Sequence, residues 1–158
     1  MSTLFYSGYG YSKITCKNVV FWFLNKYYPR HKIDVDIIHR GMKREGVYGY
    51  CDVTGDLNRP RHFLIEIQSH MCDELYIKTL FHELTHLAQW VSGSLRFRYG
   101  KMCYSQEPVE KYDYWDQPHE IEARESEDIL YDLYMSDKEG VAVSEVAQNG
   151  FQNRLIAL

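Results

Sequence analysis

The strongest structural signal in this chain is a helical pattern between Asp73 and Val91. Apolar residues recur there at the three- and four-residue spacing that places side chains on one face of a helix: Leu80, Phe81, Leu84, Leu87, Ala88 and Val91. Asp73 is suited to cap the start of this helix, and Gly93 is suited to end it. The continuous apolar stripe predicts that the helix is buried, so polar side chains along it need partners.

Three polar residues lie in the middle of this predicted helix. His82 and His86 are four residues apart, which places both imidazoles on one face, one turn apart, where they can share a metal ion. Glu83 follows the first histidine and points to the side of that metal, where a carboxylate can take a proton from a metal-activated water. Two histidines and a glutamate in a buried helix are costly unless they are paired or metal-bound. The segment therefore predicts a zinc site with Glu83 as general base.

A catalytic zinc site takes three protein ligands, so a third ligand is expected from a later element. Residues 118–123 begin the next predicted helix, because proline is favoured at the first helical position. They supply three candidates, His119, Glu120 and Glu122. A helical wheel places His119 and Glu122 nearer the apolar stripe. However, a close approach of two helices favours a small residue one turn after the ligand, and Glu120 has Ala123 there. We favour Glu120, with Glu122 and His119 as alternates.

The remaining pattern predicts an α+β fold. It indicates helices over 15–28 and 118–135. It also indicates three short strands over 33–39, 47–53 and 62–68, and the short connections between them favour antiparallel pairing. Residues 1–10 are expected to be a loop or arm. We expect one domain over 1–158, with a core at about 15–135 and a tail or weak helix over 136–158. The long loop 94–117 is expected to be functional, and it offers three possible oxyanion donors, Tyr104, Tyr112 and Tyr114.

Composition narrows the classes of function. The formal net charge is −4 and the pI is about 6.0, which argues against a nucleic-acid-binding protein. The four cysteines are widely spaced and form no close pair, which argues against a four-cysteine zinc site. The longest apolar run, 19–24, is too short to cross a membrane, and the N-terminus has no signal-peptide pattern. We therefore expect an intracellular, cytoplasmic protein with reduced thiols and no membrane partner.

The segment Leu80–His86, followed by Pro118–Ala123, resembles the small gluzincin-type metallopeptidases. These include the minimal zincin domains of the ImmA/IrrE class and similar phage-encoded metallopeptidases. The resemblance covers about residues 33–135. It implies a minimal zincin-like fold with an N-terminal helix, a small three-stranded, mainly antiparallel sheet, an active-site helix and a C-terminal ligand helix. It also implies zinc on His82, His86 and Glu120 and catalysis by Glu83.

The resemblance extends to substrate and setting. Such families bind a protein or peptide substrate as an added strand along a sheet edge, and here residues 63–68 are the expected edge. A phage-encoded protein would act in the host cytoplasm.

Two departures from the family pattern concern the ligand helix. The family often has Asp or Asn four residues after the ligand glutamate, where it supports a metal-bound histidine, whereas this chain has Arg124. That support must then come from elsewhere. The other acids of the helix are expected to form a solvated face: Glu125, Glu127, Asp128 and Asp132. The similar SprT-like proteases use a third histidine, for which His119 is the nearby equivalent.

The first functional hypothesis is a zinc metallopeptidase that hydrolyses peptide bonds with Glu83 as general base. The alternative is a non-catalytic zincin-fold module that binds zinc and regulates through a partner on its sheet edge. Glu83 favours the enzyme, because a structural zinc site needs no base and usually has four protein ligands. Proteolysis of proteins on DNA, as in SprT-like enzymes, is a third hypothesis, which the lack of a basic extension disfavours.

Overall fold

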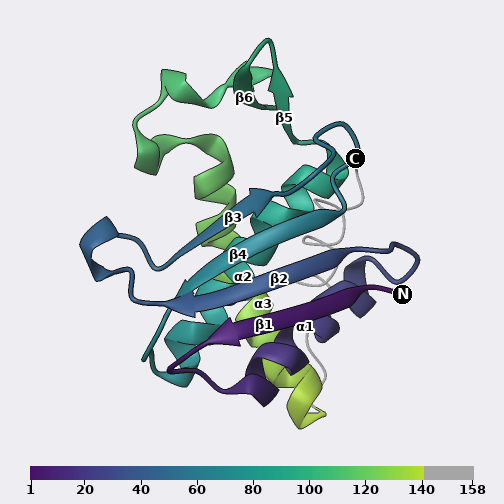
Figure 1. Ribbon diagram of the computed structural model, residues 1–158, viewed down its shortest axis with the longest axis vertical. Helices are drawn as coiled ribbons and strands as arrows, with labels where there is room; N and C mark the ends of the chain where they lie inside the picture. The colour runs from purple at the N-terminus through teal and green to yellow at the C-terminus, as the bar shows by residue number, and fades with distance from the viewer. Residues whose placement is uncertain (141–158) are drawn as a thin grey trace.

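The computed structural model of this protein describes residues 1–140, which form an α+β arrangement of three α-helices and two small sheets. Four strands make the main sheet, in the order β1 (Thr3–Gly8), β2 (Asp34–Arg40), β4 (His62–Gln68) and β3 (Gly49–Val53). Strands β1, β2 and β4 are parallel, and β3 pairs antiparallel with β4 at one edge (Figure 1).

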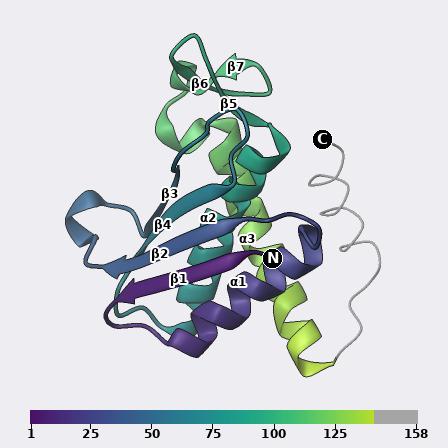
Figure 2. The same cartoon turned by 45° about the vertical axis from the view of Figure 1, so that its right-hand side comes forward.

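All three helices lie against one face of this sheet (Figures 1 and 2). They are α1 (Lys13–Tyr27), α2 (Asp73–Ser92) and α3 (Pro118–Glu139). Strands β2 and β4 bury alternate residues towards the helices, as expected for a sheet that is covered on one side: Val35, Ile37, Phe63, Ile65 and Ile67. These residues pack in one core with apolar residues of all three helices, and this core holds α2 firmly in place.

Local signals determine where α2 and α3 begin and end. Acidic residues occupy the first turn of α2, and Gly93 ends the helix in a left-handed conformation with φ 91°, which glycine adopts without strain. Pro118 is the first residue of α3. Ala123 is fully buried in α3, so a small side chain lies where this helix packs on its neighbours. The predicted ranges of both helices are confirmed, and α3 extends four residues beyond 135.

The long connection between α2 and α3 is more ordered than a loop. It contains a small antiparallel sheet of β5 (Leu95–Arg98), β6 (Lys101–Tyr104) and β7 (Glu107–Pro108). Two single-turn 3-10 helices follow, η2 (Val109–Lys111) and η3 (Tyr114–Asp116). A third, η1 (Lys43–Glu45), lies in the connection between β2 and β3. The β5–β6–β7 sheet projects beyond the end of the main sheet at the top of Figure 1.

Three expectations about the sheet are wrong. The main sheet has four strands rather than three, and only the β3–β4 pair is antiparallel. Residues 3–8 of the expected N-terminal arm form β1, which pairs with β2 along its whole length. Residues 63–68 lie in β4, an interior strand, so the edge beside α2 is β3 instead. The cause is that the chain passes from β2 to the outer position β3 before it returns to fill the central position β4.

Two other expectations concern the chain as a whole. The predicted tail lies from residue 141 onward outside the described residues. Among residues 1–140, none of the helices combines the length and the apolar character that a membrane span requires.

Candidate metal centre

Helices α2 and α3 bring two imidazoles and one carboxylate together. His82 Nε2 lies 3.1 Å from Glu120 Oε2, and His86 Nε2 lies 3.3 Å from Glu120 Oε1. One ligand atom from each of the three side chains lies within 4.8 Å of the other two, which is close enough for a shared metal ion. Glu120 is in the first turn of α3, so the ligand comes from the end of the helix that the capping pattern fixes.

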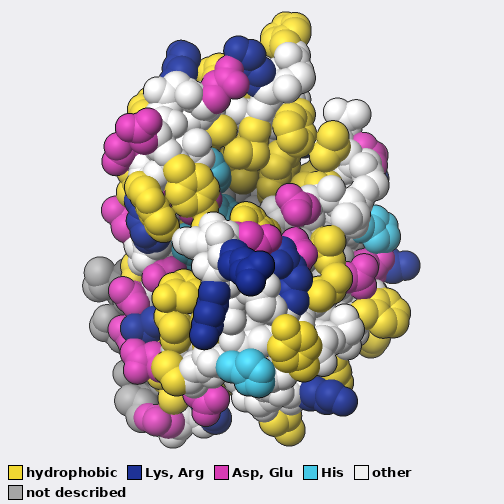
Figure 3. Space-filling model, turned by 60° about the vertical axis from the view of Figure 1, so that its left-hand side comes forward, with side chains coloured by type: hydrophobic (Ala, Val, Ile, Leu, Met, Phe, Trp, Pro, Cys, Tyr) yellow, Lys and Arg dark blue, Asp and Glu magenta, His cyan; other side chains and the backbone are white. Residues whose placement is uncertain are grey.

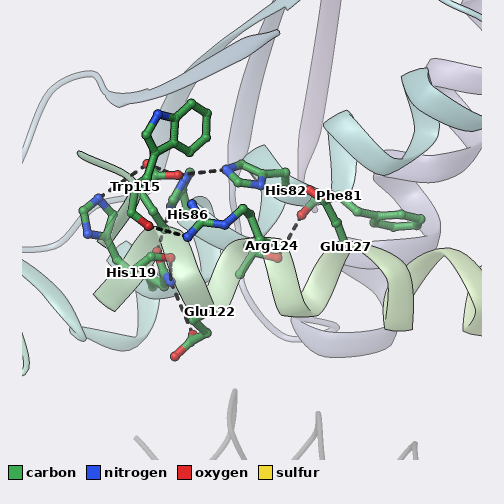
Figure 4. A network of polar contacts seen from close by, with 11 residues as sticks. Phe81, His82, His86, Trp115, His119, Glu122, Arg124 and Glu127 are labelled. Atoms are coloured by element: carbon green, nitrogen blue, oxygen red, sulfur yellow. Dashed lines mark hydrogen bonds and ion pairs between the residues drawn. The ribbon is translucent and has the colours of Figure 1, made fainter. Parts of the chain in front are cut away.

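Both histidines are also held through their second ring nitrogen. His82 Nδ1 donates to Glu127 Oε2 at 2.9 Å, and His86 Nδ1 donates to the side-chain oxygen of Gln89 at 2.8 Å (Figure 4). Such outer partners fix the tautomer and the orientation of a metal-binding histidine. The expectation that Glu127 belongs to a solvated face is therefore wrong. Glu127 contacts His82, whereas Arg124 contacts Trp115 instead.

The two alternate ligands lie in different environments. Glu122 accepts a short hydrogen bond from the Tyr104 hydroxyl and lies 3.3 Å from Gln89 Nε2, away from the histidine pair. His119 Nε2 lies 3.6 Å from Glu120 Oε1, and its buried Nδ1 has no hydrogen-bond partner among the described residues. Burial and the nearby positive His86 lower the pKa of His119 to about 4, so its ring is neutral at pH 7. The structure thus brings Glu120, rather than Glu122, to His82 and His86.

Charge in the cluster is balanced between the imidazoles and the carboxylates. Burial disfavours the charged form of His82, but its hydrogen bonds to Glu120 and Glu127 outweigh this effect and raise its pKa to about 10. The pKa of His86 is also raised, because the contact with Glu120 outweighs burial. Burial raises the pKa of Glu120 less than its two histidine partners lower it, so this carboxylate stays ionised. Without a metal, a protonated His82 supplies positive charge to the cluster.

Glu83 lies on the side of α2 that faces β3. Its side chain is only 4% exposed, and burial raises its pKa to about 7 against the lowering effect of His86 and His82. A Cβ atom placed on Gly49 of β3 would lie 2.6 Å from Glu83 Oε1, closer than real contacts allow. The glycine therefore leaves the space that the Glu83 carboxylate occupies beside the strand.

Two cavities meet at Gly49, the first residue of β3, one on each side of the cluster. The smaller, of about 280 Å³, lies on the His82 side and reaches from Gly46 to Gly49. The larger, of about 680 Å³, lies on the His86 side and reaches from Gly49 to Val53. Glu83, Glu120 and Tyr114 line both cavities, so the cluster stands at the middle of one continuous cleft.

Apolar side chains make up much of the wall of the larger cavity: Val53, Leu57, Trp90, Leu95, Phe97 and Met102. In Figure 3, hydrophobic side chains gather in a hollow in the upper part of the face shown, with histidine visible at its margin. The two cavities therefore differ in chemistry, because charged groups of α2 and α3 line much of the smaller one.

Only one of the three tyrosine candidates lies in this cleft beside the cluster. Tyr114 lines both cavities, and burial together with the negative charges of Glu120 and Glu83 raises its pKa, so its hydroxyl stays protonated. Tyr104 instead donates to Glu122, and Tyr112 lines neither cavity. Tyr114 is therefore the hydroxyl donor that η3 presents to the cleft.

The sequence pattern does not predict that four residues belong to the site: Gly49, Gln89, Arg124 and Glu127. For two of them a signal exists in retrospect. Gln89 lies three residues after His86 on the same helical face, and Glu127 lies seven residues after Glu120, which is two turns along α3. Gly49 and Arg124 become visible only when the strand and the two helices are assembled.

Comparisons of this chain with models of protein families, with curated proteins and with solved structures find no match. The function is therefore inferred from the site alone.

Proposed function

We propose that this protein is a zinc-dependent metallopeptidase in which Glu83 is the general base. The observation that carries the proposal is the His82, His86 and Glu120 cluster in the middle of a cleft, with the Glu83 carboxylate beside it. A cluster that served only to stabilise the fold would need neither an adjacent buried base nor a cleft on both sides.

The donor set suits zinc. Two imidazole nitrogens and one carboxylate oxygen are ligands that a catalytic zinc ion takes, and a fourth position then remains for water or substrate. Glu127 and Gln89 orient the two histidines from outside, as second partners do at catalytic zinc sites. When bound, the zinc ion would act as a Lewis acid that polarises the scissile carbonyl and makes water more acidic.

The residues of the chain would supply the proton transfers. Glu83 accepts the proton of the attacking water and delivers it to the nitrogen of the leaving amine, so one carboxylate acts first as base and then as acid. Without a metal, burial raises its pKa to about 7, and the positive charge of a bound zinc ion would favour the ionised carboxylate that accepts the proton. The Tyr114 hydroxyl faces the same cleft and is the candidate donor to the oxyanion that develops on the substrate.

The edge strand supports a peptide as the substrate. Among the described residues β3 pairs with β4 on one side only, and both cavities include Gly49, while the larger one continues along β3 to Val53. An extended peptide can add to such an edge through main-chain hydrogen bonds, which recognise any sequence. The scissile bond would then lie beside Gly49 and Glu83.

The test compares the wild-type protein with Glu83→Gln. Both are loaded with zinc, the bound metal is counted by plasma mass spectrometry, and cleavage of a mixture of unfolded proteins is followed by peptide mass spectrometry. We expect one zinc per chain in both proteins and a loss of hydrolysis of about 10²–10⁴-fold in the variant, since glutamine cannot accept the proton. Asp132→Asn, on the exposed face of α3, is the control and should leave both results unchanged.

Equal hydrolysis by wild type and Glu83→Gln would overturn the mechanism. Zinc binding without hydrolysis by the wild type would favour the alternative, a zinc-binding interaction module.

A further inference from the structure

Arg124 is a cation in the smaller cavity without a negative partner. Its Nη2 donates a short hydrogen bond to the Trp115 carbonyl, and its guanidinium lies over the Trp115 ring at 5.5 Å (Figure 4). Its Nη1 is buried and has no hydrogen-bond partner among residues 1–140. Within residues 1–140, no carboxylate forms an ion pair with this side chain. Arg124 therefore keeps donors and charge that the chain itself does not use.

The other basic side chain of this cavity shows the contrast. Lys78 Nζ lies 2.9 Å from Glu74 and 3.0 Å from Asp128, so its charge is matched twice. Glu127 is similarly engaged, because it accepts from His82. Glu120 and Glu127 thus contact histidines, and among the described residues the buried Nη1 of Arg124 has no hydrogen-bond partner.

A buried donor without a partner is destabilising, so native proteins rarely keep one unless a ligand satisfies it. The planar guanidinium presents its donors in a fork that matches a carboxylate. Arg124 lines the smaller cavity together with His82 and Glu120, so a carboxylate bound by its guanidinium would lie within the cleft. We propose that Arg124 binds a carboxylate of the substrate in the smaller cavity. This inference rests on the proposed function.

Strand polarity assigns this carboxylate to one side of the scissile bond. Antiparallel pairs are slightly more stable than parallel ones, so an added substrate strand is expected to run antiparallel to β3. Its amino-terminal part then lies beside Val53 in the apolar cavity, and its carboxyl-terminal part lies beside Gly46 near Arg124. The carboxylate belongs to the segment after the scissile bond, either as an acidic side chain or as the end of the peptide.

The test uses small zinc-binding probes rather than a natural substrate. Hydroxamates of succinyl-Gly and succinyl-Gly-Gly are made with a free carboxylate or a terminal carboxamide. A third form carries a terminal amide and an aspartate in place of the last glycine. Dissociation constants are measured by calorimetry on zinc-loaded Glu83→Gln protein, so that no probe is turned over. We expect a carboxylate form to bind roughly ten-fold more tightly than its carboxamide, the usual strength of a charged hydrogen bond.

Arg124→Met removes the charge and keeps the aliphatic stem, and it should abolish this preference. Arg30→Met, at an exposed site after α1, is the matched control and should retain it. If Arg124 only held η3 in place through Trp115, Arg124→Met would weaken both probe forms equally and the ratio would persist, which would overturn the proposal. Equal binding of all three forms by the parent protein would also overturn it.

The three probe forms, with a free carboxylate, a terminal carboxamide or an amidated aspartate, separate the two sources of the carboxylate. Preference for the free terminus indicates removal of residues from the end of a chain, whereas preference for the aspartate form indicates cleavage before an internal acidic residue. Each outcome supports binding by Arg124. Because hydroxamate binding needs zinc but not hydrolysis, a protein that binds the probes without charge preference contradicts this inference alone. A protein that binds no zinc contradicts the proposed function as well.

Discussion

Histidine rings lie at two places along α2, and their partners differ in charge. His39 stands alone at one place, and His82 and His86 stand together at the other. His39 of β2 is 1% exposed; its Nδ1 lies 2.9 Å from the Ser7 carbonyl and its Nε2 lies 2.8 Å from the Tyr76 hydroxyl. A carbonyl can only accept, so Nδ1 carries the proton and Nε2 accepts from Tyr76. The ring stacks on Tyr11 with 3.4 Å between centroids. Every polar atom of this imidazole therefore has a neutral partner.

The metal cluster is built in the opposite way. Its histidines contact carboxylates, and two buried nitrogens nearby have no partner in the part of the chain that the structure describes: His119 Nδ1 and Arg124 Nη1. A satisfied buried histidine specifies packing, whereas a charged cluster with unsatisfied neighbours is arranged for something that binds. We expect changes at the cluster to affect metal and activity, and changes at His39 to affect stability alone.

The largest effect is expected from loss of a ligand. His86→Ala should weaken zinc binding by more than 100-fold, which exceeds the effect of roughly 10–100-fold that outer partners have. Competition with a chromogenic chelator measures the affinity. His39→Leu, in the other group, should bind zinc as the wild type does. A His86→Ala protein with unchanged affinity would remove the distinction between the two groups.

The next effect is expected from Gly49→Ala. The added methyl group would lie 2.6 Å from Glu83 Oε1 and must displace this carboxylate. A shift of about 1 Å can reduce catalysis by about 100-fold. Zinc affinity should stay unchanged, since the glycine faces the base rather than the ligands. Gly41→Ala is the control, because a Cβ there meets only the Tyr9 hydroxyl at an ordinary 3.5 Å. Full activity in Gly49→Ala would show that the position of Glu83 is unimportant.

A smaller effect is expected from the outer partner of His82. Glu127→Ala should lower zinc affinity by roughly 10–100-fold, because His82 loses the acceptor that orients its ring. Asp132→Ala, on the exposed side of the same helix, provides the matched comparison. Equal zinc affinities in the two variants, measured by the same chelator competition, would show that Glu127 does not support His82.

The smallest effect is expected at His39 and concerns folding. His39→Leu leaves the Ser7 carbonyl and the Tyr76 hydroxyl without their partner, which costs about 1–3 kcal/mol in the free energy of unfolding at pH 7.5. Urea unfolding measures this difference. Zinc affinity should not change.

The cost of His39→Leu should shrink at acidic pH. Burial lowers the pKa of His39 below its ordinary value of 6.5, against the raising effect of its bond to Ser7. As the pH falls through 6.5, the unfolded chain takes up a proton at His39 while the folded protein does not, so the wild type loses stability. The variant lacks this loss, and the gap between the two is therefore narrower at pH 5.5 than at pH 7.5. A gap that widens would show that the folded protein favours a charged His39.

Some elements and site residues can be predicted from the sequence pattern, and others cannot. Helix α2 and the spacing of His82 and His86 are local features, so periodicity and capping predict them without knowledge of the rest. Glu120 follows from a single packing argument, that Ala123 allows a close approach. The pattern fails where partners are distant in the chain. Strand β1 is mostly exposed, with Phe5 at 68%, and only pairing with β2 reveals it.

The direction of a helix face is a second limit. A helical wheel for α3 averages over the whole helix and favours Glu122, whereas the contact with α2 selects the line through Glu120 and Glu127. Arg124 lies between them in sequence, and the structure is needed to show that Glu120 and Glu127 contact His82 instead of this arginine. Such assignments depend on how α2 and α3 pack, which a single sequence does not contain.

The two carboxylates on His82 have a consequence for recognising relatives. Two glutamates of α3, two turns apart, contact the two ring nitrogens of His82. This contact requires a fixed spacing in the sequence, Glu-x6-Glu. Gln89 adds a third position to the first motif, which becomes His-Glu-x-x-His-x-x-Gln. A paired signature of this kind can identify distant proteins with the same centre even when strands, loops and overall similarity have diverged.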